Sequence, residues 1–170
     1  MIRWLTFISL LIIAGLAVGV ILTRAQVYSA PEQPVAYNHK AHVEAGLQCL
    51  YCHTSALRSD IAGIPSMQKC MGCHTIIATD NEAVQALTSF WERGEPVPWT
   101  RVNKQPDFVF FSHQAHLRAG ENCETCHGDV GQMTLTHPVL KMDMGWCLDC
   151  HLKQDENKVA RLTDCLTCHK

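Results

Sequence analysis

All ten cysteines of this 170-residue chain lie in one short pattern, Cys-x-x-Cys-His, which occurs five times. In chain order, the pattern defines a first site (Cys49, Cys52, His53), a second (Cys70, Cys73, His74), a third (Cys123, Cys126, His127), a fourth (Cys147, Cys150, His151) and a fifth (Cys165, Cys168, His169). Two thiols one helical turn apart can bond to the two vinyl groups of one porphyrin, and the following histidine places an imidazole under its iron. The pattern therefore predicts five covalently bound haem c groups, each with its own histidine as the proximal iron ligand.

Zinc sites and disulfide bonds are the alternative uses of so many cysteines. Paired Cys-x-x-Cys motifs do build zinc ribbons, but zinc does not require a histidine directly after the second cysteine. Disulfide bonds would not require the histidines at all. Five repetitions of the complete motif therefore favour haem attachment over a zinc-binding or purely structural protein.

Five further histidines match the number of sites and are the candidates for the sixth, distal iron ligand: His39, His42, His113, His116 and His137. Equal numbers of irons and spare histidines favour bis-histidine ligation throughout. With both axial positions filled, no iron is open to a substrate, so the expected role is electron transfer rather than catalysis at haem. Methionine is the rival ligand for one site, through Met142 or Met144, and a methionine would raise the potential of that haem.

An internal repeat sets the order of these residues. Residues 37–53 align without gaps to residues 111–127, and eight of the 17 positions are identical. The shared positions include a His-x-x-His pair, an Ala-Gly pair and the haem motif, and a second haem motif follows in each copy. The fifth site is appended to the second copy.

The second half of the chain, with its His-x-x-His pair, three haem motifs and the additional His137, resembles the tri-haem members of the class III cytochromes c. The resemblance implies that His113 ligates the third-site iron, His116 the fourth and His137 the fifth. By the repeat, His39 would serve the first site and His42 the second. His137 lies ten residues before Cys147, which is farther than the family spacing, so its assignment departs from the family pattern.

The elements that position these sites divide the chain into five segments. We expect a membrane anchor helix (1–24), a linker (25–36), a di-haem repeat (37–74), an inter-repeat helix and strap (75–110), and a second di-haem repeat with the fifth haem (111–170). The fold class is mainly helical and irregular, with short helices around a haem core. Thr79 and Glu82 predict a capping box for a helix over residues 81–93 that ends at Gly94, with Ala83, Leu87, Phe90 and Trp91 on its apolar face. Residues 95–107 are expected to run extended across the surface, as a docking strap or a plain connector.

The anchor is predicted from 20 consecutive uncharged residues between Arg3 and Arg24. That length crosses a hydrocarbon layer of roughly 30 Å as a helix. A cleaved signal peptide, with Thr23, Arg24 and Ala25 at its cleavage site, is the alternative, but its apolar region should be about 7–15 residues long. Because haem c is attached outside the cytoplasm, we expect a single-pass membrane protein with its N-terminus inside and its haem domain on the periplasmic side.

The stretch PVPWTRVNKQPDFVFFSH between the repeats, together with the two His-x-x-His pairs and the single anchor, resembles the pentahaem cytochrome c subunit of alternative complex III. The resemblance implies relay of electrons from a quinol-oxidising complex to a soluble or membrane-bound periplasmic acceptor. It also implies partners: an iron–sulfur subunit, polytopic quinol-binding subunits and a mono-haem cytochrome.

Two other electron-transfer functions remain as alternative hypotheses. A stand-alone membrane-anchored quinol dehydrogenase feeding a periplasmic reductase would also have one helix and several haems. A multihaem reductase would need an iron with an open position, and no Cys-x-x-Cys-Lys motif occurs. The formal net charge of −2 gives no basic surplus, so no nucleic-acid partner is expected.

Overall fold

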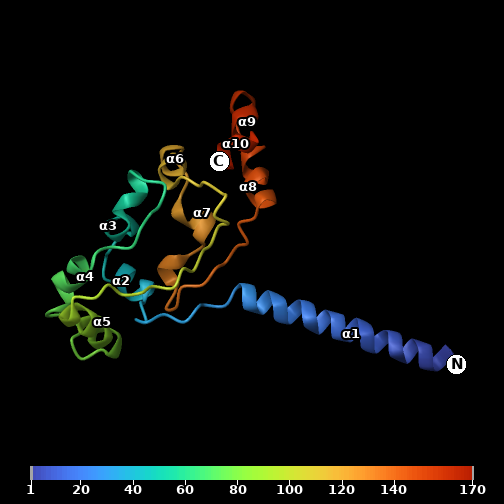
Figure 1. Ribbon diagram of the computed structural model, residues 1–170, viewed down its shortest axis with the longest axis horizontal. Helices are drawn as coiled ribbons and strands as arrows, with labels where there is room; N and C mark the ends of the chain where they lie inside the picture. The colour runs from blue at the N-terminus through green and yellow to red at the C-terminus, as the bar shows by residue number, and fades with distance from the viewer. Residues whose placement is uncertain (1, 170) are drawn as a thin grey trace.

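The computed structural model describes the backbone of residues 2–169 and the side chains of residues 4–23 and 28–169. This part of the chain forms ten α-helices and two 3₁₀ helices, and no β-strand occurs in it (Figure 1). Most of the helices are short, and long irregular segments connect them. The prediction of a mainly helical and irregular chain is confirmed.

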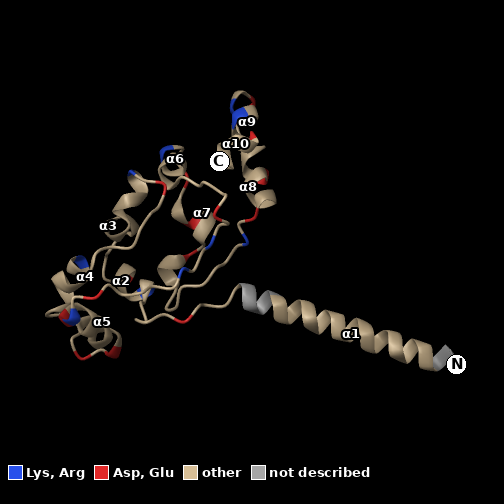
Figure 2. Ribbon diagram, in the orientation of Figure 1, with Lys and Arg blue, Asp and Glu red and all other residues tan. Residues whose placement is uncertain are grey.

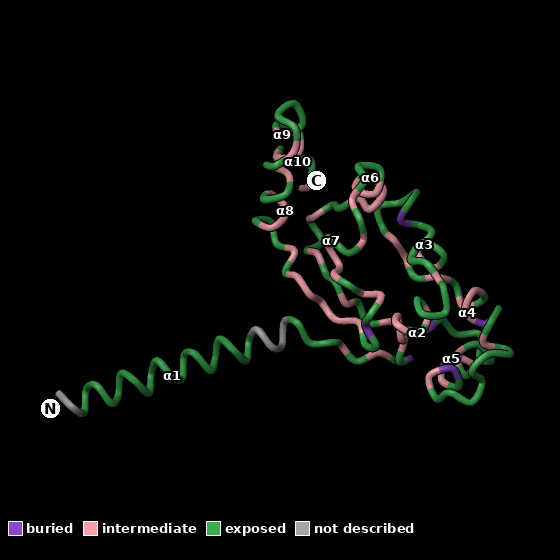
Figure 3. Tube along the Cα trace, turned by 180° about the vertical axis from the view of Figure 1, so that it is seen from behind, coloured by how far each residue is buried: buried purple, intermediate pink, exposed green. Residues whose placement is uncertain are grey.

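The first helix, α1 (Ile2–Val27), extends away from the rest of the molecule as a single rod (Figure 1). Its segment Trp4–Thr23 has a mean hydropathy of 2.8, and none of that segment is buried against the protein (Figure 3). The same segment, Trp4–Thr23, carries no Lys, Arg, Asp or Glu (Figure 2). The helix is therefore long and apolar enough to cross a membrane, and a signal sequence would satisfy the same test. The side chains of Arg3 and Arg24, which flank the apolar run, lie outside the described residues.

The two copies of the repeat have the same local structure. Each opens with a six-residue helix, α2 (His39–Glu44) or α6 (His113–Arg118), and the two helices are 74 residues apart. The side chains of Asn38 and Ser112 cap these helices by accepting hydrogen bonds from the backbone N–H of the third helical residue, Ala41 or Ala115. A short helix with the haem motif follows, α3 (Cys49–Cys52) or α7 (Cys123–His127), and then a 3₁₀ helix, η1 (Thr54–Leu57) or η2 (Val130–Gln132).

Longer helices carry the second haem motif of each copy, α4 (Met67–His74) and α8 (Met144–His151). Two further helices complete the C-terminal part, α9 (Glu156–Leu162) and α10 (Cys165–Cys168). The Asp143 carboxylate caps α8 by accepting from the Trp146 backbone N–H, and Asp164 caps α10 by accepting from that of Leu166. These caps fix where the fourth and fifth cysteine pairs begin their helical turns.

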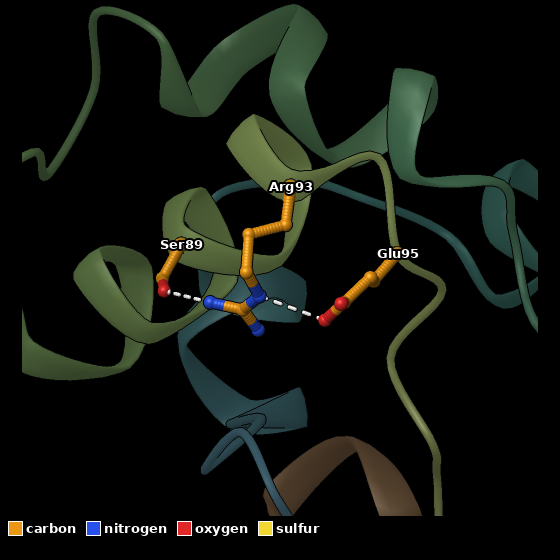
Figure 4. A network of polar contacts seen from close by, with 3 residues as sticks. All are labelled: Ser89, Arg93 and Glu95. Atoms are coloured by element: carbon orange, nitrogen blue, oxygen red, sulfur yellow. Dashed lines mark hydrogen bonds and ion pairs between the residues drawn. The ribbon is translucent and has the colours of Figure 1, made fainter.

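The predicted inter-repeat helix is α5 (Glu82–Arg93), and it ends as expected at Gly94, whose φ of 67° is left-handed. Its start differs from the prediction. Asn81, and not Thr79, is the N-cap, because the Asn81 side chain accepts a 2.9 Å hydrogen bond from the Ala83 backbone N–H. At the other end, the Arg93 guanidinium donates to the Ser89 hydroxyl and to the Glu95 carboxylate (Figure 4).

Replacing Asn81 with alanine is expected to lower stability by about 1 kcal/mol, which is the usual cost of a lost N-cap. Thr79→Ala is the matched control and should leave stability within about 0.5 kcal/mol of the parent, as for other surface substitutions. Thermal unfolding of the haem-loaded protein measures both. Equal losses in the two variants would mean that Asn81 does not cap α5.

A small apolar cluster lies where α4 and α5 meet, and it consists of Val35, Met71, Leu87 and Val97. Phe90 and Trp99 pack against it, whereas the predicted face residue Trp91 is 40% exposed. Val84 of the same helix is buried outside this cluster. Val97 brings the inter-repeat strap into the cluster, so this part of the strap is buried rather than lying across the surface. Burial of an apolar side chain is favourable enough to hold an otherwise irregular segment in place.

Few side chains outside this cluster are buried. Among the described residues the buried side chains are Val35, Ala56, Met71, Val84, Leu87, Val97 and Met133 (Figure 3). Ile76 and Leu166, by contrast, are 82% and 72% exposed. The polypeptide alone thus supplies very little apolar core, which is what a fold completed by large apolar cofactors requires.

Candidate haem-binding sites

The cysteines of the five motifs lie on five short helices, α3, α4, α7, α8 and α10. All ten are free thiols, which leaves every one of them available for a thioether bond. Each proximal histidine stands at the C-terminal end of its helix or directly after it. The sequence places the two thiols one helical turn apart, and the helices give that spacing a common face.

Three pairs of histidines are brought together across the chain. The ring centres of His42 and His74 are 6.0 Å apart, those of His113 and His127 are 6.3 Å apart, and those of His116 and His151 are 6.1 Å apart. A metal–imidazole bond is about 2 Å long and the ring centre lies about 1 Å beyond the nitrogen, so two imidazoles on one iron have centres about 6 Å apart. Each pair therefore has the separation that one iron between two histidines requires.

For His39, the information on its neighbours is electrostatic and not a ring contact. The pKa of His39 is lowered to about 4, chiefly by burial and then by the neighbouring charges of His53 and His42. His53 therefore contributes to the electrostatic surroundings of His39, and ligation of the first site by His39 stays a prediction of the repeat. Burial also lowers the pKa of His127, with His113 and His53 nearby. A neutral imidazole is the form that binds a metal, so burial favours the ligating state of both residues.

The Nδ1 atoms of the histidines are all engaged, which fixes the orientation of each ring. Eight of the ten Nδ1 atoms lie 2.6–3.2 Å from a backbone carbonyl oxygen. The Nδ1 of His39 is 2.9 Å from the Thr136 hydroxyl. A carbonyl partner selects the tautomer with the proton on Nδ1, and this leaves Nε2 with a free lone pair for iron.

The tenth histidine, His127, has the side-chain amide of Asn103 3.2 Å from its Nδ1. An amide presents either its NH₂ group or its oxygen after a half-turn about its last bond. In the structure the Asn103 nitrogen faces His127, and only the flipped amide would accept the Nδ1 proton as the carbonyls do for the other rings. Asn103 belongs to the inter-repeat strap, so this segment contributes to the third site.

An aromatic ring packs on the His-x-x-His pair in both repeats. Tyr37 lies parallel to His42, with ring centres 4.5 Å apart at 22°, and meets His39 edge-on at 4.7 Å and 82°. Phe111 makes the equivalent contacts in the second repeat, at 4.4 Å and 27° to His116 and at 4.9 Å and 90° to His113. Burial raises the pKa of Tyr37 to about 12, with smaller effects of Cys52 and Cys70. The sequence analysis did not identify Tyr37 and Phe111 as site residues, although an aromatic residue stands at the first position of both copies of the repeat.

The described histidines of the fifth site are not brought together as those of the second, third and fourth sites are. Among the described residues, no ring contact joins His137 to His169 or to any other histidine. His137 faces the Leu135 carbonyl and lines a shallow surface pocket with Tyr28, just after α1. His169 instead lies beside Phe108, directly after the strap, with its Nδ1 3.2 Å from the Phe108 carbonyl and its ring 5.7 Å from that of Phe108.

Met67, Met142 and Met144, the methionines nearest the second and fourth sites in sequence, have different surroundings. Met67 packs against the apolar cluster, whereas Met144 is 62% exposed at the start of α8. The Met142 carbonyl accepts a 3.2 Å hydrogen bond from the Gln105 side chain, which belongs to the strap that ends just before Phe108. Met142 and the fifth-site histidine thus share one short segment as neighbour.

The arrangement fits c-type haem. Free thiols at helical spacing, oriented imidazoles and pairs about one iron apart are what a haem with two axial histidines needs. Over residues 4–23 and 28–169, no group of three or more His, Cys, Asp and Glu side chains converges as a structural zinc site would require.

Known families match both halves of the chain. Residues 20–97 match the family described as "Class III cytochrome C family", and residues 109–170 match "Cytochrome c7 and related cytochrome c". The chain is also similar to the protein of Nitratidesulfovibrio vulgaris named "Menaquinone reductase, multiheme cytochrome c subunit". The two are 34% identical, and the alignment covers 84% of this chain and 79% of the relative.

Proposed function

This chain belongs to the multihaem c-type cytochrome family of the Nitratidesulfovibrio vulgaris protein, and on that premise we propose that it carries five covalent haem c groups and relays electrons from a quinol-oxidising membrane complex to a periplasmic acceptor. The observation that carries the proposal is the set of paired histidines about 6 Å apart, because each pair would hold one haem iron from both sides. Histidines that held an iron in this way would leave no position for a substrate, so the site would exchange electrons only. The chain is then an electron-transfer subunit rather than a catalyst by itself.

Bound haem supplies a one-electron iron couple at each site. The residues of the chain hold that couple in place. The motif cysteines fix each porphyrin covalently, and the Nδ1 hydrogen bonds keep each imidazole turned with Nε2 toward the iron position. Tyr37 and Phe111 pack on the distal histidine pairs and restrict their rotation. Fixed ligands need little rearrangement when an iron changes charge, which favours fast electron exchange.

The proposed distal ligands are those of the sequence prediction: His39 for the first site, His42 for the second, His113 for the third, His116 for the fourth and His137 for the fifth. The ring contacts of His42, His113 and His116 support three of them. Met142 or Met144 is the alternative ligand for one site. Loss of the near-infrared absorption of an iron–methionine bond in Met142→Leu, but not in Met144→Leu, would favour Met142. An unchanged spectrum in both variants would support His137.

The direction of electron flow has a second candidate. The relative is named a menaquinone reductase, which favours electrons passing from a periplasmic donor to menaquinone. The resemblance of the inter-repeat strap to the alternative complex III subunit favours the opposite direction. Reduction of the haems by menaquinol in solubilised membranes, against their oxidation by menaquinone, distinguishes the two.

The partners proposed for this subunit are an iron–sulfur subunit, polytopic quinone-binding subunits and a mono-haem cytochrome. Mass spectrometry of gently solubilised membranes tests the proposal, since it reads both the mass of five added haems on this chain and the identity of what co-purifies. Recovery with an iron–sulfur protein and polytopic subunits is expected. Recovery alone, or with a periplasmic reductase, would instead favour a stand-alone quinol dehydrogenase.

Removal of residues 1–27 behind a cleavable export signal is expected to release the haem domain into the periplasm with its full haem content. The physical reason is that α1 is the only described segment apolar enough to span a bilayer. Fractionation and haem staining measure the outcome, and the full chain behind the same signal is the control. Retention in the membrane would mean that partner subunits, rather than α1, hold the domain there.

A further inference from the structure

The two repeats dock on each other through equivalent contacts made in both directions. Helix α6 of the second repeat packs on η1 of the first, and α2 of the first packs on η2 of the second. The Gln114 backbone N–H donates to the Ser59 carbonyl at 3.2 Å, and that of Lys40 donates to the Met133 carbonyl at 3.1 Å. Donors and acceptors in these two bonds are each 74 residues apart. The contact is therefore the same one formed twice.

These contacts place the first and third sites at the junction of the repeats. The Nδ1 of His113, on the third site, lies 2.7 Å from the Asp60 carbonyl of the first repeat. The Nδ1 of His39, on the first site, is 2.9 Å from the Thr136 hydroxyl of the second repeat. Each of these distal histidines is therefore oriented by the opposite half of the chain. The distal histidines of the second and fourth sites are held within their own repeat, by the carbonyls of Asn38 and Ser112.

Contacts between the helices extend this order to the other sites. The Lys69 side chain of α4 donates a 2.6 Å hydrogen bond to the Tyr51 carbonyl of α3, so the second site lies beside the first. His113 and His116 stand on one helix, α6, and their rings lie next to those of His127 and His151, so the third site lies beside the fourth. The Nδ1 of His151 is 2.9 Å from the Leu162 carbonyl, and the Thr167 hydroxyl donates to the Arg161 carbonyl at 2.7 Å, so the fourth and fifth sites meet at the end of α9. The helices agree with this order, since α4, α3, α7 and α8 follow one another from left to right in Figure 1, with α10 above α8.

We infer that the five attachment sites succeed one another in space in the order second, first, third, fourth, fifth, and that electrons cross from one repeat to the other between the first and third sites. The inference rests on the five haems of the proposed function and adds the path through them. Each crossing oxidises one ferrous site and reduces the next ferric site by one electron, and no bond forms or breaks. A quinol is the electron source and a one-electron periplasmic acceptor is the sink. The second and fifth sites are then the two ends of the path.

Deleting a haem from an end and from the middle of this path has opposite consequences. In Cys70→Ala/Cys73→Ala, the remaining four haems are expected to keep exchanging electrons as fast as in the parent protein. In the matched variant Cys123→Ala/Cys126→Ala, exchange between the first and fourth haems is expected to be lost. Haem-methyl NMR of the partly reduced full chain measures the exchange, with each haem assigned through contacts to its cysteines. If the sites followed chain order, the first deletion would isolate the first haem, and that result would overturn the inference.

A structure of the haem-loaded full chain decides the question where a deletion variant does not fold. The haem on Cys49 and Cys52 is expected to have the second-site and third-site haems as its nearest neighbours. A second-site haem lying next to the third-site haem would overturn the order. Both measurements read only the arrangement of sites, so their failure leaves the co-purification with quinone-linked subunits untouched. Failure of that co-purification would likewise leave the order standing.

Discussion

Replacing His42 with methionine is expected to raise the midpoint potential of the second-site haem by on the order of 0.1 V, a fraction of the span of about 0.8 V that axial ligands control. His42 has its ring centre 6.0 Å from that of His74, and this separation supports the proposal that it is the distal ligand of the second site. A thioether donates less to iron than an imidazole does and stabilises the ferrous state relative to the ferric state. Spectroelectrochemical titration with site assignment by electron paramagnetic resonance measures the change.

The repeat supplies two controls for this substitution. His116 occupies the equivalent position in the second repeat, with its ring 6.1 Å from that of His151, so His116→Met should raise the fourth-site potential by a similar amount. His39→Met should act on the first site instead. A titration in which His42→Met moved only the first-site haem would reverse the assignment within the pair. An equal shift of all haems would point to a general loosening of the domain.

The proximity of three histidine pairs was predictable because it depends on local chemistry that repeats, whereas the ligand assignment itself stays a prediction. A motif with two thiols and an imidazole has one common use, and a His-x-x-His pair on one helical turn directs its side chains to different partners. The expected neighbours of His42, His113 and His116 are the ones that the structure brings close. Among the described residues, His39 and His137 make no such ring contact with their expected partners, and His137 is also the residue whose spacing departed from the family pattern.

The groups that orient the ligands were not predictable from the sequence. Most of them are backbone carbonyls, such as that of Asp60, and a carbonyl is present at every position of every sequence. Thr136 and Asn103 lie 97 and 24 residues from the histidines that they contact, so no local pattern marks them. The aromatic at Tyr37 and Phe111 is different, since its recurrence in both copies is a signal that sequence reasoning could have used.

The N-cap of α5 shows a related limit. Thr79 and Glu82 have the spacing of a capping box, but Ala78 adopts a positive φ of 56° and the chain turns there, so Asn81 is the residue that enters the helix. Capping patterns compete over a few residues, and the turn that precedes the helix decides between them. The strap also differs from its prediction, for another reason. Its proline-rich sequence predicts an extended chain across the surface, but Val97 and Trp99 pack in the apolar cluster with residues of α5. The sequence alone does not show that these residues lie side by side.

The chain produced without haem attachment, in a cell that lacks the attachment machinery, is expected to remain largely unfolded outside α1 and α5. The reason is the shortage of buried side chains, because a cluster of Val35, Met71, Leu87 and Val97 cannot order the five short cysteine-bearing helices. Helices of four or five residues such as α3, α7 and α10 are not stable on their own. Haem attachment would therefore be coupled to folding, as metal binding is in small metal-dependent domains.

Limited proteolysis and circular dichroism of the haem-free and haem-loaded chains measure this coupling. Rapid cleavage through residues 37–80 and 111–169 is expected in the haem-free chain, with protection in the loaded one. The segment around α5 is the internal reference, since it has caps at both ends and the largest share of the apolar cluster. A haem-free chain that resisted protease and unfolded cooperatively would show that the polypeptide has a sufficient core of its own. In that case the docking of α2 on η2 and of α6 on η1 would carry the stability here assigned to the cofactors.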